Sequence, residues 1–386
     1  MNFNKLILFI RLLFQKIFLY GYYVNAVLLI VSYFLSYIHP DAFVLAPLIS
    51  LIFPLLVAVH LFYLFYFLLR FKIIKSIISI IIICFFIPTI RNYYNITFNS
   101  NKFSTKDSSI FSMMSFNVKL FDLYNWQQNK LTREKIFQYL NTHRADVICF
   151  QEFYTSEDSN DFNNLEKIRA LFPSYTIHQQ YFVTLRRNDH WGLLTLSKFP
   201  IVNKGIVDFN NAKNNGCIFT DVIINKDTVR IYNVHLQSYS LFKNQNKKNK
   251  EESFFNSLNE QSAGKNFFSK ISYSAKLRSR QLDAILRIVH ESNYPSIIIG
   301  DFNDMPNSYL IRTLHKENFS DAFEKRGNGF GLTFHDKLYG RIDYVMYDKN
   351  FQCLSFFTDN ENTQHLSDHY PIKAFLKLST TSESKN

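Results

Sequence analysis

Four short apolar segments of the chain each end in one or two polar side chains that can take part in catalysis. The segments are rich in β-branched and aromatic residues, which is typical of buried strands. Ligand sites in open α/β sheets lie beyond the carboxyl ends of the strands, so we expect these polar side chains to meet in one site. They are Asn117, Glu152, His235, Asp301 and Asn303.

Two motifs nearer the C-terminus add acids and a second histidine. RIDYV at 341–345 places Asp343 inside an apolar segment, and LSDHYP at 366–371 places Asp368 beside His369. Carboxylate and amide oxygens suit Mg²⁺ or Mn²⁺, and no Cys/His cluster has the spacing of a zinc site. Such a set suits phosphoester hydrolysis, because a metal ion screens the phosphate, a His–Asp pair activates water, and another group assists the leaving oxygen.

The elements that must position these side chains begin at residue 110. Apolar runs and helical periodicities alternate from there without a second linker, which predicts one α/β layered domain over 110–380. Strands are expected at 110–118, 145–150, 175–182, 192–196, 201–208, 218–224, 229–235, 296–300, 342–347, 352–358 and 372–378. Helices are expected at 131–143, 165–172, 276–291 and 307–316. The polar segment 240–274 is expected to be a surface insertion, and 381–386 a tail.

The first 91 residues are expected to be a membrane region. Three apolar stretches at about 18–38, 42–69 and 73–90 predict three transmembrane helices, and the polar segment 92–109 predicts a linker. Basic residues precede the first stretch and fill the loop between the second and third. The positive-inside rule then places the N-terminus in the cytoplasm and the catalytic domain on the outer side of a bacterial inner membrane.

Charge and cysteine content narrow the class of protein. The net charge is +12, of which half lies in the first 91 residues. The remainder is only mildly basic, which is poor evidence for a nucleic-acid partner. A hydrophobic content of 47% excludes a disordered chain, and four cysteines exclude a disulfide scaffold. Whether Cys217 and Cys353 pair is left open by the sequence.

The motifs MSFNV, FQE, NVHL, GDFND, RIDYV and LSDHYP occur in this order between about 110 and 378. Together they resemble the endonuclease/exonuclease/phosphatase superfamily, which includes deoxyribonuclease I and bacterial neutral sphingomyelinases. The resemblance implies a four-layer α/β sandwich, with two central sheets flanked by helices, here preceded by the three predicted transmembrane helices. It also implies a metal-dependent hydrolase acting on phosphate esters, with Mg²⁺ or Mn²⁺ as its cofactor.

The resemblance further implies a role for each motif residue. Glu152 resembles the main metal ligand, with Asn117 nearby and Asp368 as a further ligand or the ligand of a second metal ion. Asp301 would position or deprotonate the attacking water, and Asn303 would bind a phosphate oxygen. His369 would contact the phosphate or act as a base, held by Asp343, and His235 matches a histidine of the deoxyribonuclease I and sphingomyelinase branches.

Four further residues are weaker candidates for substrate binding. Arg278 and Gln281 lie one turn apart on the helix before GDFND, where they could face phosphate or solvent. Thr333 and Phe334 follow a glycine-containing stretch at 327–331, where they could line the substrate pocket or only pack.

The leading hypothesis is therefore a membrane-anchored phosphodiesterase that binds the lipid bilayer through its N-terminal helices. Its substrate would be nucleic acid or a phospholipid headgroup. A phosphomonoesterase acting on sugar or inositol phosphates and a non-catalytic membrane scaffold that retains the fold are the alternatives. The sequence does not determine the oligomeric state.

Overall fold

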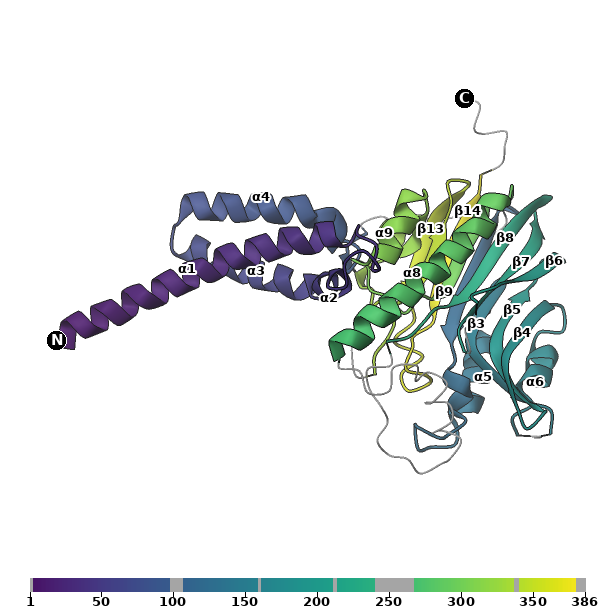
Figure 1. Ribbon diagram of the computed structural model, residues 1–386. Coiled ribbons are helices and arrows are strands. Elements are labelled where there is room, and N and C mark those ends of the chain that lie inside the picture. The colour runs from purple at the N-terminus through teal and green to yellow at the C-terminus, as the bar shows by residue number, and fades with distance from the viewer. Residues whose placement is uncertain are drawn as a thin grey trace.

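The computed structural model describes residues 3–97, 107–158, 161–210, 214–239, 267–336 and 340–379. A bundle of helices projects from a domain built of two sheets and their covering helices (Figure 1). The predicted tail 381–386 lies outside the described residues, as do most of the predicted insertion and the middle of the predicted linker.

Two six-stranded sheets form the centre of the domain, and each mixes parallel and antiparallel pairs. The first sheet has the order β10-β12-β9-β8-β7-β6, and the second has the order β13-β14-β2-β3-β5-β4. The strands of the first sheet are β6 (Ile201–Val207), β7 (Gly216–Ile224), β8 (Asp227–His235), β9 (Ser296–Asp301), β10 (Ser320–Asp321) and β12 (Asp343–Tyr347). Those of the second are β2 (Ile110–Asn117), β3 (Val147–Ser156), β4 (Thr176–Leu185), β5 (Asp189–Ser197), β13 (Phe351–Thr358) and β14 (Ile372–Leu378).

Helices cover the outer face of each sheet. α8 (Phe267–Glu291) and α9 (Tyr309–Lys316) pack on the first sheet, and α5 (Thr132–Thr142) and α6 (Asn164–Leu171) pack on the second. A third apolar cluster fills the space between the two sheets. The central strands are thus buried on both faces, which explains their nearly continuous apolar sequences. The predicted α/β sandwich of two sheets flanked by helices is confirmed.

Several short elements were not predicted. They are a 3₁₀ helix (Lys119–Asp122), β1 (Tyr94–Asn95), α10 (Ala322–Arg326) and β11 (Gly329–Phe330). β1 pairs with β11, so the first residues of the predicted linker form a strand against the domain. Segments of two to five residues carry too little periodicity to be recognised from sequence.

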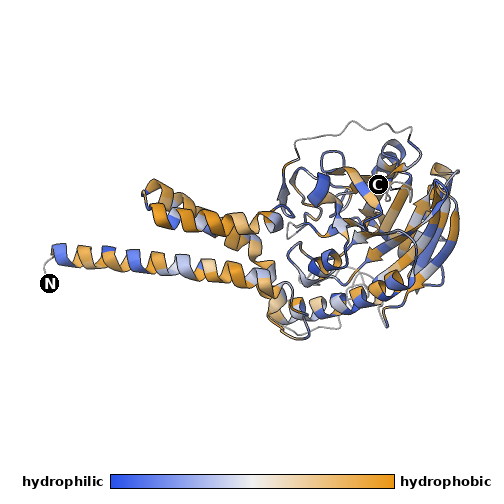
Figure 2. Cartoon of the chain, turned by 90° about the horizontal axis from the view of Figure 1, so that it is seen from above, coloured by the Kyte–Doolittle hydropathy of each residue, from blue (hydrophilic) through white to orange (hydrophobic). Residues whose placement is uncertain are grey.

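The N-terminal helical bundle, predicted to be a membrane region, consists of α1 (Phe3–Leu35), α2 (Ala46–Leu51), α3 (Phe53–Leu69) and α4 (Ile73–Ile90). Among the described residues, α1 and α4 are long and apolar enough to cross a membrane. The expectation of one continuous helix over 42–69 is wrong, because this stretch breaks at Ile52 and leaves α3 with 17 residues. Pro47 and Pro54 each begin a helix, and proline lacks the N–H that would continue a preceding one. Figure 2 shows the projecting helices as mostly hydrophobic.

One further expectation is corrected, and the open question of a disulfide is answered. The helix predicted at 276–291 begins at Phe267, so residues 267–274 of the predicted insertion are helical. Ile271 and Ala275 continue the buried face of this helix, but the small and polar residues around them hide the period. All four cysteines are free, and Cys217 and Cys353 do not pair because they lie in different apolar clusters on different sheets.

Candidate active site

Strand register brings the predicted residues to one edge of the two sheets. On the first sheet, Asp301 at the end of β9 lies between His235 of parallel β8 and Asp343 of antiparallel β12, and both are its direct register partners. On the second sheet, Asn117 at the end of β2 is paired with Gln151, the residue before Glu152. The carboxyl ends of β2, β8 and β9 therefore meet, as the sequence predicts. Glu152 was expected just beyond a strand ending at 150, but β3 continues to Ser156, and Glu152 lies inside it at the irregularity in its pairing with β5 between Phe150 and Phe153.

Asp301 is the centre of the cluster. Its Oδ2 accepts a hydrogen bond of 3.0 Å from Asn117 Nδ2 and lies 3.7 Å from His235 Nε2 and 3.7 Å from His369 Nε2. Its Oδ1 accepts a hydrogen bond of 2.9 Å from the backbone N–H of Asn303. Asp301 is 1% exposed, so these contacts rather than water determine the orientation of its carboxylate.

His369 forms a close pair with Asp343, whose Oδ2 lies 2.9 Å from His369 Nδ1. Asp343 is held in turn by Thr333, whose Oγ1 accepts a hydrogen bond of 3.1 Å from the backbone N–H of Asp343. The ring of Phe334 lies 5.0 Å from the ring of His369. Thr333 thus orients Asp343, and Phe334 packs against His369.

Glu152 and Asp368 lie on the more open side of the cluster. Glu152 Oε1 lies 3.8 Å from His235 Nε2, and Asp368 Oδ2 lies 2.7 Å from Lys119 Nζ. Lys119 was not predicted, although it follows Asn117 by two residues. Glu152 and Asn303 both have left-handed backbones, with φ of 49° and 51°. Such backbone conformations in residues other than glycine are found preferentially at functional sites.

Burial and neighbouring charges shift the pKa values of the acids. Burial, with the repulsion of Asp368, raises the pKa of Glu152. Burial and then Asp343 raise the pKa of Asp301 to about 6, against the opposing effect of His369. Burial acts to raise the pKa of Asp368 as well, but the ammonium group of Lys119 outweighs it and holds that pKa below its usual value.

The two histidines are shifted in opposite directions. Burial lowers the pKa of His235. Burial acts in the same sense on His369, but the carboxylates of Asp343 and Asp301 outweigh it and raise its pKa to about 10. At neutral pH His369 is therefore a cation and His235 is neutral.

The cluster offers suitable groups for a hard cation. One ligand atom from each of Asp301, Asp343 and His369 lies within 4.8 Å of the others, and Glu152 and Asp368 add two carboxylates beside them. Asp301 pairs in register with Asp343, and the carboxylate of Glu152 is repelled by that of Asp368, so a divalent cation would offset the negative charge gathered here. This donor set fits Mg²⁺ or Mn²⁺ better than a soft metal.

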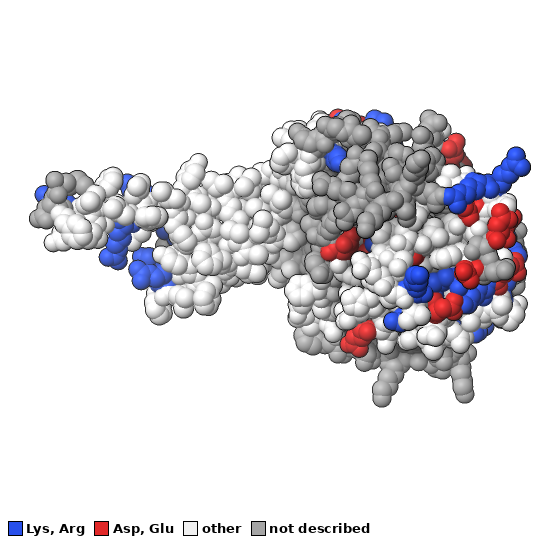
Figure 3. Space-filling view, turned by 90° about the horizontal axis from the view of Figure 1, so that it is seen from below, with Lys and Arg blue, Asp and Glu red and all other residues white. Residues whose placement is uncertain are grey.

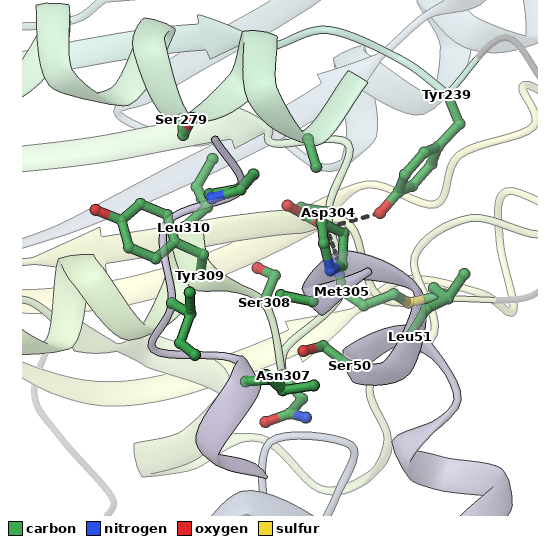
Figure 4. A pocket seen from close by; sticks show the side chains of 16 residues that line it. Ser50, Leu51, Tyr239, Ser279, Asp304, Met305, Asn307, Ser308, Tyr309 and Leu310 are labelled. Atoms are coloured by element: carbon green, nitrogen blue, oxygen red, sulfur yellow. Dashed lines mark hydrogen bonds between the residues drawn. The ribbon is translucent and has the colours of Figure 1, made fainter. Parts of the chain in front are cut away.

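Arg278 faces neither phosphate nor solvent, which corrects both expectations for it. It is fully buried, its Nε lies 3.1 Å from Asp304 Oδ2, and its Nη1 donates to Gln237 O at 2.8 Å. Gln281 Oε1 accepts from the backbone N–H of Gln237 at 3.0 Å. Asp304 Oδ1 also accepts a hydrogen bond of 2.7 Å from Tyr239 Oη, as Figure 4 shows. α8 therefore ties together the loops that follow β8 and β9.

The sequence model of the Endonuclease/Exonuclease/phosphatase family matches residues 114–369, about two thirds of the chain. The chain belongs to this family. Members of the endonuclease/exonuclease/phosphatase family hydrolyse phosphoester bonds, and this chain is an enzyme of that type. A second model, of a domain of unknown function (DUF8431), matches residues 15–93. No curated protein matches the chain significantly.

Solved structures of endonuclease/exonuclease/phosphatase proteins share the fold. The one from Bacteroides vulgatus is 16% identical, with 70% of this chain and 99% of that chain covered and a TM-score of 0.52. The protein from Leptotrichia buccalis is 13% identical, with 69% and 100% covered and a TM-score of 0.51. The one from Bacteroides thetaiotaomicron is 14% identical, with 70% and 98% covered and a TM-score of 0.50. At these identities the likeness concerns the fold alone.

Proposed function

We propose that this chain is a membrane-anchored phosphodiesterase that requires a divalent metal ion and hydrolyses nucleic acid or phospholipid headgroup diesters by attack of water. The observation that carries the proposal is the cluster of carboxylates and histidines around Asp301, in a chain of a phosphoesterase family. Residues 1–91 would form the membrane region, 92–109 the linker and 110–380 the catalytic domain.

Glu152 and Asp368 would hold the metal ion, with the amide of Asn117 beside them. A site with carboxylate oxygens and few other protein ligands suits Mg²⁺ or Mn²⁺. The bound ion would neutralise the charge of the phosphate as the water attacks it. Lys119, already paired with Asp368, adds a second positive charge at the same place.

Asp301 would accept the proton of the attacking water. Its pKa of about 6 leaves it ionised at neutral pH, yet basic enough to take a proton. The water oxygen forms a bond to phosphorus, and the bond from phosphorus to the leaving oxygen breaks. His369, cationic at neutral pH, would contact the phosphate and supply a proton to the leaving oxygen, so its charge favours this role over that of a base. Neutral His235 and Asn303 would contact phosphate oxygens.

The helical bundle would anchor the enzyme in the inner membrane. Figure 3 shows Lys and Arg at the end of the bundle far from the domain and mostly uncharged atoms between. Those basic residues lie in the first half of α1 and around the turn between α3 and α4. The positive-inside rule would put that end in the cytoplasm and the domain on the outer face. A 17-residue α3 reaches about 26 Å, close to the thickness of a thin bilayer core, so we infer three crossings.

The test uses the full chain reconstituted in lipid nanodiscs. Hydrolysis of DNA, RNA and phospholipid is measured with Mg²⁺, with Mn²⁺ and after chelation by EDTA. His369→Asn should abolish the activity, while His365→Asn, an exposed position four residues away, should retain it. Activity that persists in EDTA would contradict metal dependence, and hydrolysis of phosphomonoesters alone would contradict the diester assignment. Metal binding without any hydrolysis would favour the scaffold instead.

A further inference from the structure

The segment between α1 and α2, residues 36–45, lies along the first half of α8 and is called the connector here. Ser272, Lys276 and Arg280 are spaced four residues apart and therefore share one stripe of α8. Ser272 Oγ donates to Val44 O at 2.7 Å, and the cationic groups of Lys276 and Arg280 lie 3.5 and 3.2 Å from the carboxylate of Asp41. This stripe of α8 thus faces the connector.

Phe268 continues the same stripe one turn toward the N-terminus of α8. It is 61% exposed, and the neighbouring Phe267 is 48% exposed. The two rings contact each other edge to face, with centroids 5.8 Å apart. Large apolar side chains that lie exposed side by side mark a surface of contact with another apolar phase or partner.

The connector presents three more exposed apolar side chains in the same area. Phe43, Val44 and Leu45 are 40 to 49% exposed, although Val44 is bonded to α8 through its backbone. Val44, at the end of the connector, contacts the second turn of α8, and α8 begins on the side of the domain from which the bundle projects (Figure 1). These five side chains, called the apolar rim, extend the apolar outer surface of the bundle onto the domain.

We propose that the apolar rim rests in the headgroup boundary of the bilayer, so that the catalytic domain lies against the lipid surface. The inference rests on the proposed membrane anchoring by α1, α3 and α4. A lipid surface fits the rim because the rim is continuous with the side of the bundle that would face lipid. Transfer of aromatic side chains such as Phe43, Phe267 and Phe268 from water to the bilayer boundary lowers the free energy.

The same contact would hold the active-site edge near the membrane. Asp304 and Met305, in the loop after β9, line a pocket together with Ser50 and Leu51 of α2 (Figure 4). On the other side, Arg341, two residues before Asp343, donates to the backbone carbonyl of Asn92 at 2.9 Å. The loops that carry the site therefore pack on the membrane region. A phosphoester presented at the lipid surface would reach the site without crossing bulk solvent.

The test measures the depth of spin labels on the full chain in proteoliposomes of phosphatidylcholine and phosphatidylglycerol. Cys84 is replaced by serine, since the other three cysteines are buried. Single labels are placed by Phe268→Cys, by Tyr294→Cys and by Ile81→Cys, all at exposed positions. Tyr294 lies just beyond the far end of α8, more than about 30 Å from Phe268. Each labelled chain must elute as the parent does on gel filtration in detergent.

The expected result is that the labels at 268 and 81 collide several-fold more often with oxygen than with a water-soluble nickel complex, and that the label at 294 shows the reverse. A lipid signal at 81 with an aqueous signal at 268 would overturn the rim but not the membrane anchoring. An aqueous signal at 81 would overturn the anchoring and the rim together. A lipid signal at both 268 and 294 would also overturn the rim, because the whole of α8 would then lie in lipid.

Discussion

Replacing Asp343 with asparagine should move the alkaline limb of the pH–activity profile. In the parent enzyme His369 has a pKa of about 10, so its charge should persist until strongly alkaline pH. Asp301 has a pKa of about 6 and must lose its proton to accept one. The parent kcat/KM should therefore rise with pH near 6, stay level, and fall near 10.

The size of the change follows from the distances. Raising the pKa of His369 from its usual 6.5 to about 10 corresponds to about 5 kcal/mol in favour of the imidazolium. At an effective dielectric constant of about 20, a carboxylate at the 2.9 Å of Asp343 supplies about 6 kcal/mol, and one at the 3.7 Å of Asp301 supplies about 4 kcal/mol. Burial opposes both. Removing the charge of Asp343 thus removes about the whole net stabilisation of the imidazolium.

The alkaline limb of Asp343→Asn should accordingly fall from about 10 to near neutral pH. Loss of the oriented Nδ1 contact should add a pH-independent decrease of at least about 10-fold, the lower end of what is lost with the carboxylates that orient histidines of metal sites. The assay measures kcat/KM between pH 5.5 and 10.5 with a soluble phosphodiester as substrate. The control is Asp208→Asn, which removes an exposed carboxylate. An alkaline limb that stays near 10 in Asp343→Asn would refute the assignment of that limb to His369.

Three further perturbations test other parts of the reasoning. Glu152→Gln should weaken Mn²⁺ binding in calorimetry and lower activity at least about 10-fold, while exposed Glu157→Gln should change neither. Arg278→Met should lower stability by about 3–5 kcal/mol, seen as a lower unfolding temperature, because it leaves a buried acid without its cation; an unchanged midpoint would contradict this. Burial lowers the pKa of His178 to about 4 in the folded state, so the unfolded chain binds more protons between about 4 and 6.5. Neutral His178 therefore makes the free energy of unfolding pH-dependent by about 3 kcal/mol: the folded state is fully stable above pH 6.5 and loses this amount as the pH falls toward 4. His178→Gln should therefore flatten the unfolding temperature over that range, and an equally steep profile would show that other groups are responsible.

The contacts of Arg278 link the N-terminal helical bundle to the loops that carry the active-site residues. Arg278 ties Asp304 to Gln237, and these residues follow the strands that end in Asp301 and His235. Met305 from the same loop lines a pocket with residues of α2. A substitution at this junction is thus expected to disturb both the docking of the helices and the geometry of the active-site loops.

The residue pattern predicted an α/β layered domain and most of the cluster around Asp301, while the arrangement in two packed sheets was implied by the family resemblance of the motifs. A strand buried on both faces has an apolar sequence, and the polar residue that ends it marks the rim of the sheet, so His235 and Asp301 could be located from local pattern. Glu152 also follows an apolar run, but it lies inside β3 at a pairing irregularity that the run does not reveal. The apolar character of α1 and α4 was equally visible, because it depends only on composition along the chain.

Only the tertiary structure decided what depends on contacts between distant segments. Arg278 carries no local sign of burial, and its partners Gln237 and Asp304 lie 41 and 26 residues away. Lys119 reaches Asp368 only because its backbone turns into the left-handed region after β2. Periodicity records which face of an element is buried, but not which neighbour buries it.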